Sequence, residues 1–185
     1  MIEETALPDV KVVTPRWFED HRGAFCETYN RKTFAKHGIY DVFQQDNHSI
    51  SAAANTVRGL HFQAPPHAQG KLIRVVAGVI LDVAVDIREG SRTYGKWVSV
   101  LLSAENRKQL YVPAGFAHGF VTKTPDTEVL YKCTDIYAPE CEGTIRFDDP
   151  EIGIDWGIDP GDAILSDKDA KATGFAAFSS PFVYA

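Results

Sequence analysis

The sequence predicts a mainly β fold, a barrel or jelly roll with a few short helices. In the middle of the chain, apolar and polar residues alternate in steps of two, the period at which side chains of a strand change faces. These segments are rich in Val, Ile, Leu and Tyr, which are common in strands. Gly, Pro, Asn and Asp separate them at short intervals, and short strands at close spacing are typical of barrels and jelly rolls.

Two classes of element follow from these patterns. The predicted strands, in chain order, are 57–63, 71–87, 96–103, 108–113, 119–123 and 128–137. Helices are expected at 30–38, which ends at Gly38, and at 166–172, where Ser166 is the N-cap and Asp169 occupies the capping-box position.

The whole chain, 1–185, is long enough for one domain with a sizeable core. We expect the early segment, about 1–50, to cover a sheet face or to cross to a partner subunit. The tail, about 170–185, is apolar and should pack on a surface of its own chain or of a partner.

Charge and cysteine content exclude several classes of function. The net charge is −6, so no basic excess is available for nucleic acid or an anionic membrane. The acidic start "MIEETALPDV" does not resemble a signal peptide, and no apolar run is long enough to span a bilayer. Cys26, Cys133 and Cys141 form no CxxC pair and are expected to be reduced thiols of a cytoplasmic protein.

Polar residues interrupt the otherwise apolar predicted strands. His61, Lys71, Asp82 and Tyr131 lie within them, and His118 lies in "PAGFAHGF". Each residue alone has an ordinary explanation, such as a hydrogen-bonded core histidine or a solvent-facing lysine. Burying all of them in one small barrel is costly, so together they favour a polar cavity that serves a function.

The segment "VRGLHFQ" raises a geometric question. In a regular strand, Arg58 and His61 point to opposite faces. Gly59 lies between them and permits a bulge. We therefore predict a kink at 58–60 that turns both side chains toward the same ligand.

Several blocks of the sequence together resemble a known family. They are "DHRGAFCETY", "FQQDNHSIS", "VRGLHFQ", "GKLIRVV", "LDVAVDIREGSRTYGKW", "LSAENRKQLYVPAGFAHGF", "EVLYKCTDIYAPECEGTIRFDDPEIGIDW" and "LSDKD". In this order they resemble the dTDP-4-dehydrorhamnose 3,5-epimerase family, over about residues 10–169. The resemblance implies a cupin-type jelly roll, a homodimer, no cofactor, and a dTDP-linked 4-keto-6-deoxy sugar as substrate. No metal site is expected, because the first cupin motif lacks its HxH pair.

The resemblance also implies roles for individual residues. His61 matches the base, Asp169 the carboxylate that orients it, Tyr131 the proton donor and Lys71 the residue near the keto oxygen; Asp167 is the nearest alternative to Asp169. His118 and Asp82 match a second polar pair in the pocket. Residues that match contacts to the nucleotide or sugar are Arg22, Glu27, Gln45, Asn47, Arg58, Glu142 and Lys168.

These residue types suit epimerisation beside a ketone. The reaction removes a carbon-bound proton and returns one to the other face, through an enolate with charge on the 4-keto oxygen. It therefore needs a base, an acid on the opposite face, and a donor or cation at the oxygen. Histidine suits the base because its pKa is near neutral, and a buried carboxylate on its other nitrogen fixes the tautomer.

Three other interpretations remain open from the sequence. A related enzyme that epimerises a single carbon of another 4-keto deoxysugar would use the same His and Tyr. A non-catalytic sugar-nucleotide binding barrel would need the arginines but neither base nor acid. A metal cupin is favoured by "PAGFAH", but "LHFQ" carries a single His where metal cupins usually carry an HxH pair.

Overall fold

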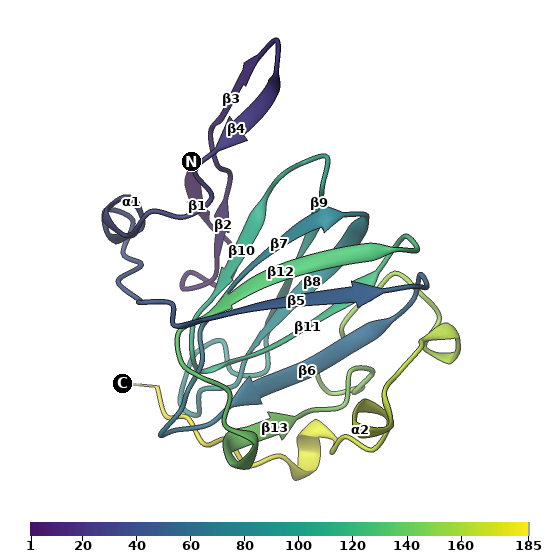
Figure 1. Ribbon diagram of the computed structural model, residues 1–185. Coiled ribbons are helices and arrows are strands. Elements are labelled where there is room, and N and C mark those ends of the chain that lie inside the picture. Colours follow the sequence, from purple (N-terminus) through teal and green to yellow (C-terminus); the bar gives the residue numbers. More distant parts are fainter. Residues whose placement is uncertain (185) are drawn as a thin grey trace.

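Two antiparallel sheets form the body of the protein in the computed structural model, which describes residues 1–184 (Figure 1). The six-stranded sheet contains, from edge to edge, β1 (Ile2–Glu4), β2 (Lys11–Val13), β10 (Gln109–Val112), β7 (Lys71–Ala77), β12 (Thr127–Cys133) and β5 (Gln45–Ser51). The five-stranded sheet contains β13 (Glu142–Thr144), β6 (Val57–Gln63), β11 (Phe116–Thr122), β8 (Val79–Asp86) and β9 (Trp97–Ser103). The predicted mainly β, jelly-roll class is confirmed.

The predicted strand 71–87 is wrong as a single element. It is divided into β7 and β8, which lie in different sheets and meet at Gly78. Gly78 has a φ of +79°, and a Cβ there would come within 2.3 Å of the Thr127 hydroxyl oxygen. Only glycine suits this turn, and the apolar residues on both sides gave no sign of it.

The other predicted strands exist with adjusted ends. The segment 57–63 is β6, 96–103 contains β9, and 108–113 contains β10. β11 begins earlier than predicted, at Phe116, and β12 ends earlier, at Cys133. β5 was not predicted as a strand.

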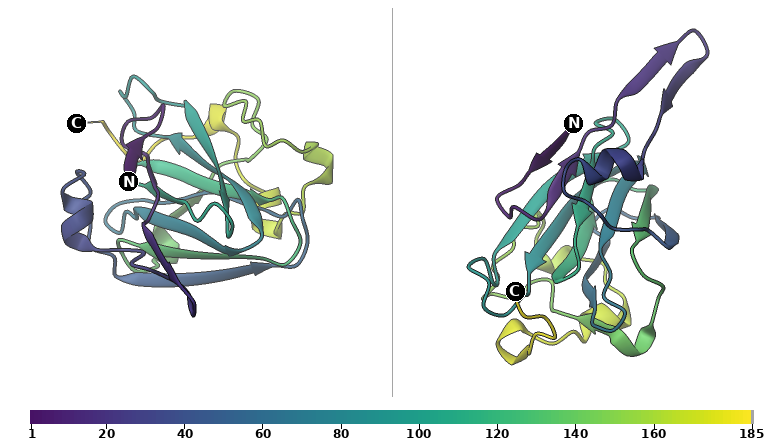
Figure 2. Two further views of the ribbon diagram at one scale, coloured as in Figure 1. Left: turned by 90° about the horizontal axis from the view of Figure 1, so that it is seen from above. Right: turned by 90° about the vertical axis from the view of Figure 1, so that its left-hand side faces the viewer.

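Apolar side chains fill the space between the two sheets and also cover the outer face of the five-stranded sheet. The inner cluster contains Ile73, Ile80, Leu102, Leu110 and Phe120, all nearly inaccessible to solvent. On the outer face, residues such as Leu60, Val85 and Trp156 pack with tail residues Phe175, Phe178 and Phe182. The tail, which includes the short 3₁₀ helix η3 (Phe175–Ala177), therefore packs on its own chain (Figure 2).

The N-terminal segment only partly matches its prediction. β1 and β2 extend one edge of the six-stranded sheet and β5 forms the other edge, so these parts do not cover a face. Residues 27–44 do, because Phe34 and Ile39 pack against Leu72 and Tyr111. The hairpin of β3 (Trp17–Asp20) and β4 (Gly23–Cys26) projects away from the barrel (Figure 1).

Both predicted helices are present and short. α1 (Arg31–Ala35) begins at Asn30, whose side-chain oxygen accepts two backbone N–H groups, and Gly38 follows it with a φ of +80°. α2 (Asp167–Ala170) begins at Ser166, whose hydroxyl accepts the backbone N–H of Asp169. Two further 3₁₀ turns are η1 (Pro139–Cys141) and η2 (Pro160–Asp162). Within residues 1–184, no helix is long and apolar enough to cross a membrane.

Candidate active site

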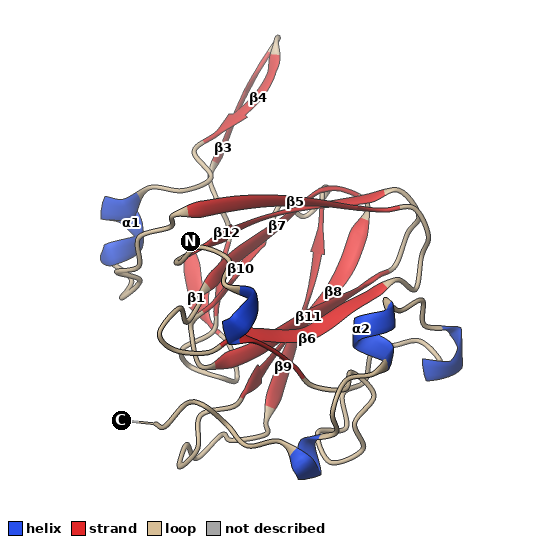
Figure 3. Ribbon diagram, turned by 60° about the horizontal axis from the view of Figure 1, so that its bottom comes forward, coloured by secondary structure: helices blue, strands red, loops and turns tan. Residues whose placement is uncertain are grey.

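A cavity of about 500 Å³ opens between the two sheets. It is at the end of the barrel where α2 lies beside β6, an arrangement of the backbone that Figure 3 shows. Its polar lining comes from both sheets and from α2: Ser49, Thr56, Arg58, His61, Lys71, His118, Tyr131, Tyr137, Glu142, Ser166, Lys168 and Asp169. A smaller hollow of about 110 Å³ shares His61, Lys71 and Tyr131 with it and adds Gln45 and Asn47. The cavity has the size and the few convergent polar groups of a small-molecule site.

His61 and Asp169 form a close pair on the wall made by β6 and α2. The His61 Nε2 lies 2.5 Å from Asp169 Oδ1, and the Asp169 side chain is only 3% exposed. Burial alone would raise the pKa of Asp169, but the hydrogen bond and positive charge of His61 lower it below its usual value. Asp167, the alternative in the sequence, is exposed, so the structure selects Asp169 as the partner of His61.

Lys71 and Tyr131 lie on the facing wall, in the six-stranded sheet. Tyr131 on β12 is opposite Ile73 on β7, and Lys71 is opposite Cys133. Burial lowers the pKa of Lys71, with the charges of Cys133 and Asp82 acting against this change. Burial raises the pKa of Tyr131, so its phenol keeps its proton at neutral pH. His61 and Tyr131 therefore come from different sheets.

A second His–Asp pair stands next to the first. His118 Nε2 lies 2.6 Å from Asp82 Oδ1, and His118 is directly opposite His61 in the register of β11 and β6. Asp82 is completely buried, and its Oδ2 has no hydrogen-bond partner within the described residues. The two residues form the expected pair, but only His118 lines the cavity, and Asp82 lies buried behind it.

The predicted kink at 58–60 is confirmed. The β6–β11 register shifts between His118 and Phe120, and Gly59 has a φ of +133°. Arg58 and His61 both line the cavity, although Leu60 between them is buried in the outer apolar cluster. The bulge is what turns an arginine and a histidine, three residues apart, toward one space.

Arg22 and Glu27 do not line the cavity of their own chain. Arg22 lies at the turn of the β3–β4 hairpin, 79% exposed, and its guanidinium pairs with Asp20. Glu27 follows β4, where the hairpin returns to the barrel. The remaining predicted contact residues, Gln45, Asn47, Arg58, Glu142 and Lys168, all face the main cavity or its smaller extension.

Sequence reasoning missed several lining residues, notably Ser49 and Tyr137. Ser49 lies on β5 two residues after Asn47, so strand alternation would have placed it on the same face. Its hydroxyl is buried and has no partner among the described residues. Tyr137 was expected at the end of the strand 128–137, but β12 ends at Cys133 and Tyr137 lies in the irregular chain that follows. Thr56, Ile164, Leu165 and Ser166 also lie outside regular elements.

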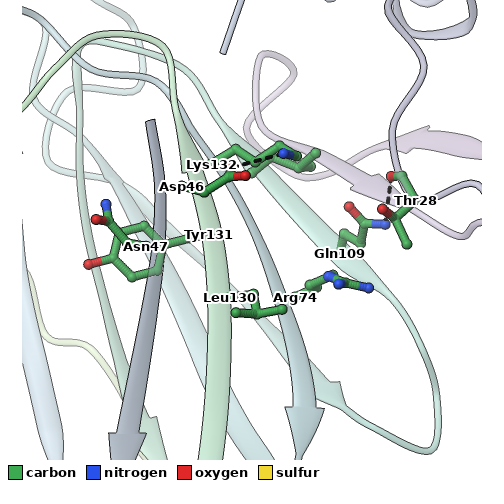
Figure 4. A pocket seen from close by; sticks show the side chains of 9 residues that line it. Thr28, Asp46, Asn47, Arg74, Gln109, Leu130, Tyr131 and Lys132 are labelled. Carbon is green, nitrogen blue, oxygen red and sulfur yellow. Dashed lines mark hydrogen bonds and ion pairs between the residues drawn. The ribbon is translucent and has the colours of Figure 1, made fainter. Parts of the chain in front are cut away.

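A separate hollow of about 140 Å³, smaller than the main cavity, lies on the outer face of the six-stranded sheet (Figure 4). Lys132 pairs there with Asp46 at 2.8 Å, beside Arg74 and Leu130 (Figure 4). No histidine lines it. Its groups are not arranged for proton transfer, in contrast to the cavity between the sheets.

No group of three or more His, Cys, Asp or Glu side chains within residues 1–184 is placed to hold a metal ion. The histidines of the cavity, His61 and His118, are instead each held by a single carboxylate. This donor set fits acid–base chemistry better than metal ligation.

Comparison with known proteins gives consistent matches. The family model for dTDP-4-dehydrorhamnose 3,5-epimerase matches residues 4–177. The dTDP-4-dehydrorhamnose 3,5-epimerase of Salmonella typhimurium is 51% identical over 173 residues, 93% of each chain.

Solved structures agree with the sequence matches. The crystal structure of dTDP-6-deoxy-D-glucose-3,5-epimerase from Legionella pneumophila, in complex with dTDP-4-keto-L-rhamnose, has a TM-score of 0.94 at 42% identity. It covers 100% of this chain and 99% of that chain. A 3′-monoepimerase from Streptomyces bikiniensis, in complex with dTDP-quinovose, has a TM-score of 0.85 at 32% identity and covers 94% and 87% of the two chains.

Proposed function

Because the chain belongs to the dTDP-4-dehydrorhamnose 3,5-epimerase family, we propose that its cavity converts dTDP-4-dehydro-6-deoxy-D-glucose to dTDP-4-dehydro-L-rhamnose. The protein is an isomerase of dTDP-L-rhamnose formation. One observation carries the assignment of residues: the His61–Asp169 pair lies on one wall, and Tyr131 lies on the wall opposite.

His61 is the base in this proposal. It removes the proton from the carbon next to the ketone, and the negative charge of Asp169 stabilises the imidazolium that forms. Electrons from the broken C–H bond move to the 4-keto oxygen and give an enolate. Lys71, as an ammonium or as a hydrogen-bond donor, stabilises the charge on that oxygen.

Tyr131 returns a proton to the opposite face of the same carbon. Its phenol is protonated at neutral pH because burial raises its pKa, so it can donate when the enolate collapses. Once His61 has released its proton to water and Tyr131 has regained one from water, the same cycle at the second carbon gives the double epimer. The position of His118 opposite His61 supports a contact of His118 with the sugar, with Asp82 holding its imidazole.

The nucleotide is bound at the outer part of the cavity. Arg58 and Lys168 supply positive charge for the diphosphate, and guanidinium matches phosphate oxygens with two hydrogen bonds. Gln45 and Asn47, in the adjoining hollow, offer amides to the base or ribose. Glu142 lines both the cavity and the adjoining hollow.

A single-carbon epimerase is the second candidate. The structural similarity to a 3′-monoepimerase favours keeping it, because that enzyme shares the fold. Because both kinds of enzyme share the fold, the pose of the sugar determines how many carbons react. Deuterium exchange at C3 and C5 distinguishes the two candidates.

We also propose a homodimer in which the β3–β4 hairpin, with Arg22 and Glu27, reaches the cavity of the partner. Phe18 is 52% and Phe25 69% exposed on this hairpin, which projects from the barrel (Figure 1). Large apolar side chains exposed together support an interface. Sedimentation should give a dimer at micromolar concentration, and a monomer would contradict this arrangement.

A cytoplasmic location is a further part of the proposal. Cys26, Cys133 and Cys141 are all free thiols in the structure, which fits a reducing compartment.

The test of the catalytic assignment is His61→Asn, measured beside His37→Asn. His37 is an exposed histidine after α1, far from the cavity lining, and serves as the matched control. The expected result is that H61N binds dTDP as the unaltered protein does but loses turnover, whereas H37N keeps both. Normal turnover by H61N would contradict the proposed mechanism. If the unaltered protein binds dTDP but never turns over substrate, it is a non-catalytic binding barrel.

A further inference from the structure

A chain of polar side chains closes one side of the cavity opening. Lys168 Nζ donates to Glu142 Oε1 at 2.7 Å, and the Tyr137 hydroxyl donates to Glu142 Oε2 at 3.1 Å. The backbone N–H of Tyr137 in turn donates to Gln45 Oε1 at 2.8 Å. These contacts connect α2, β13, the segment after β12, and β5, so they join the two sheets across the opening.

This chain lies at the outer end of the cavity rather than at its base. The Lys168 side chain is 47% exposed and the Glu142 side chain 24% exposed, whereas the side chain of Asp169, next to Lys168 on α2, is 3% exposed. Lys168 and Glu142 can therefore exchange partners with a ligand that enters, while the His61–Asp169 pair stays in place behind them.

The two cations of the opening are in different states. Arg58 donates to the Ser51 hydroxyl and the Ile50 carbonyl, which are neutral groups, so its charge is available to an anion. Lys168 is held by a carboxylate. A diphosphate that uses both cations competes with Glu142 for the charge of Lys168, and it binds against the negative charge of that carboxylate.

Glu142 is not left without a partner when Lys168 leaves. The hydrogen bond from Tyr137 to its second oxygen remains, and Glu142 is partly exposed to water. Burial alone would raise the pKa of Glu142, but the hydrogen bond and charge of Lys168 lower it, so the carboxylate is ionised at neutral pH. The exchange of Lys168 between a carboxylate and a phosphate is therefore a low-cost step in both directions.

We propose that Glu142 is a competing anion that sets the affinity of the site: it holds Lys168 until the diphosphate of the nucleotide displaces it, and takes Lys168 back when product leaves. This inference rests on the proposed function, because it assumes that a diphosphate occupies the cavity. Substrate and product carry the same diphosphate. A carboxylate that weakens both equally lowers affinity without changing the chemical step, and it speeds release.

The test is calorimetric titration with inorganic pyrophosphate and with dTDP, at one ionic strength, on Glu142→Gln, Lys168→Gln and the double variant. E142Q is isosteric, and the expected result is pyrophosphate binding about 10-fold tighter, which corresponds to about 1.4 kcal/mol. K168Q should weaken binding. In the K168Q background, E142Q should give little further gain, because the effect acts through Lys168. The matched control is Glu140→Gln on η1, an exposed glutamate two residues away, which makes the same change in net charge and should stay within about 2-fold.

Three results would overturn the inference. Unchanged or weaker pyrophosphate binding by E142Q would mean that Glu142 orients Lys168 for the nucleotide. An equal gain in the K168Q background, or in E140Q, would mean a general charge effect. Failure of both the unaltered protein and E142Q to bind pyrophosphate or dTDP would also reject the role of Glu142. Deuterium exchange into the keto sugar, measured separately, would then show whether the proposed function still holds.

Discussion

Replacing Asp169 with Asn removes the negative charge next to His61 while keeping a side chain of the same size. In the unaltered protein the carboxylate lies 2.5 Å from the imidazole and is 3% exposed, so solvent screens the pair weakly. A hydrogen bond to a charged partner contributes about 1.5–3 kcal/mol. In the proposed mechanism imidazolium forms when His61 accepts the substrate proton, so D169N would lose this energy in the transition state. At about 1.4 kcal/mol for each factor of ten, D169N should be about 10- to 150-fold slower.

The assay is the rate of deuterium incorporation into the keto sugar, with dTDP affinity measured in parallel. Affinity should change little, because Asp169 faces His61 rather than the outer cations. Asp167→Asn is the matched control: it is an exposed acid on the same helix and should keep the rate within about 2-fold. Equal rates for D169N and the unaltered protein, or equal losses in D167N and D169N, would refute the assignment of Asp169.

Three further predictions follow from the structure. Lys71→Met should lower the exchange rate about 10²- to 10³-fold, as loss of an oxyanion donor does. The control is Lys36→Met, at an exposed lysine, which should not lower the rate. Equal rates in the two variants would reject the role of Lys71. Although burial of Asp86 alone would raise its pKa, hydrogen bonds from Arg88, Ser91 and Thr93 lower it to about 2. The stability that the Asp86 carboxylate contributes is therefore present above pH 4 and lost as the pH falls toward 2. In urea unfolding, D86N should be about 2 kcal/mol less stable than the unaltered protein at pH 7, and this difference should vanish at low pH. A difference that stays constant with pH would contradict the prediction. Gly59→Ala should lower the free energy of unfolding by about 3 kcal/mol or more, because the Cβ of the alanine would lie 2.5 Å from the Gly119 Cα. An unchanged urea midpoint would show that the bulge is not needed.

The sequence predicted most of the strands because apolar alternation is a local signal. It missed the division at Gly78, since a one-residue turn between two apolar runs leaves the alternation almost unbroken. It also missed β5, which has mostly polar residues at an edge of the sheet, and with it Ser49. The kink at Gly59 could be predicted, because it was required to bring Arg58 and His61 to one side.

The site itself depended on long-range contacts. His61 and Asp169 are 108 residues apart, and alternation says nothing about which carboxylate a histidine meets. Only the resemblance to a family favoured Asp169 over Asp167, and the geometry of α2 then separated them, because one faces the cavity and the other faces solvent. Tyr137 was placed in the predicted strand 128–137, but it lies in irregular chain after β12, whose path depends on packing.

The most direct test is proton exchange followed by NMR. The protein is incubated with dTDP-4-dehydro-6-deoxy-D-glucose in D₂O, and the sugar signals at C3 and C5 are followed, with H61N measured beside it. We predict that the unaltered protein exchanges both positions and that H61N exchanges neither. Exchange at one carbon would make the protein a single-carbon epimerase, and exchange that persists in H61N would contradict His61 as the base.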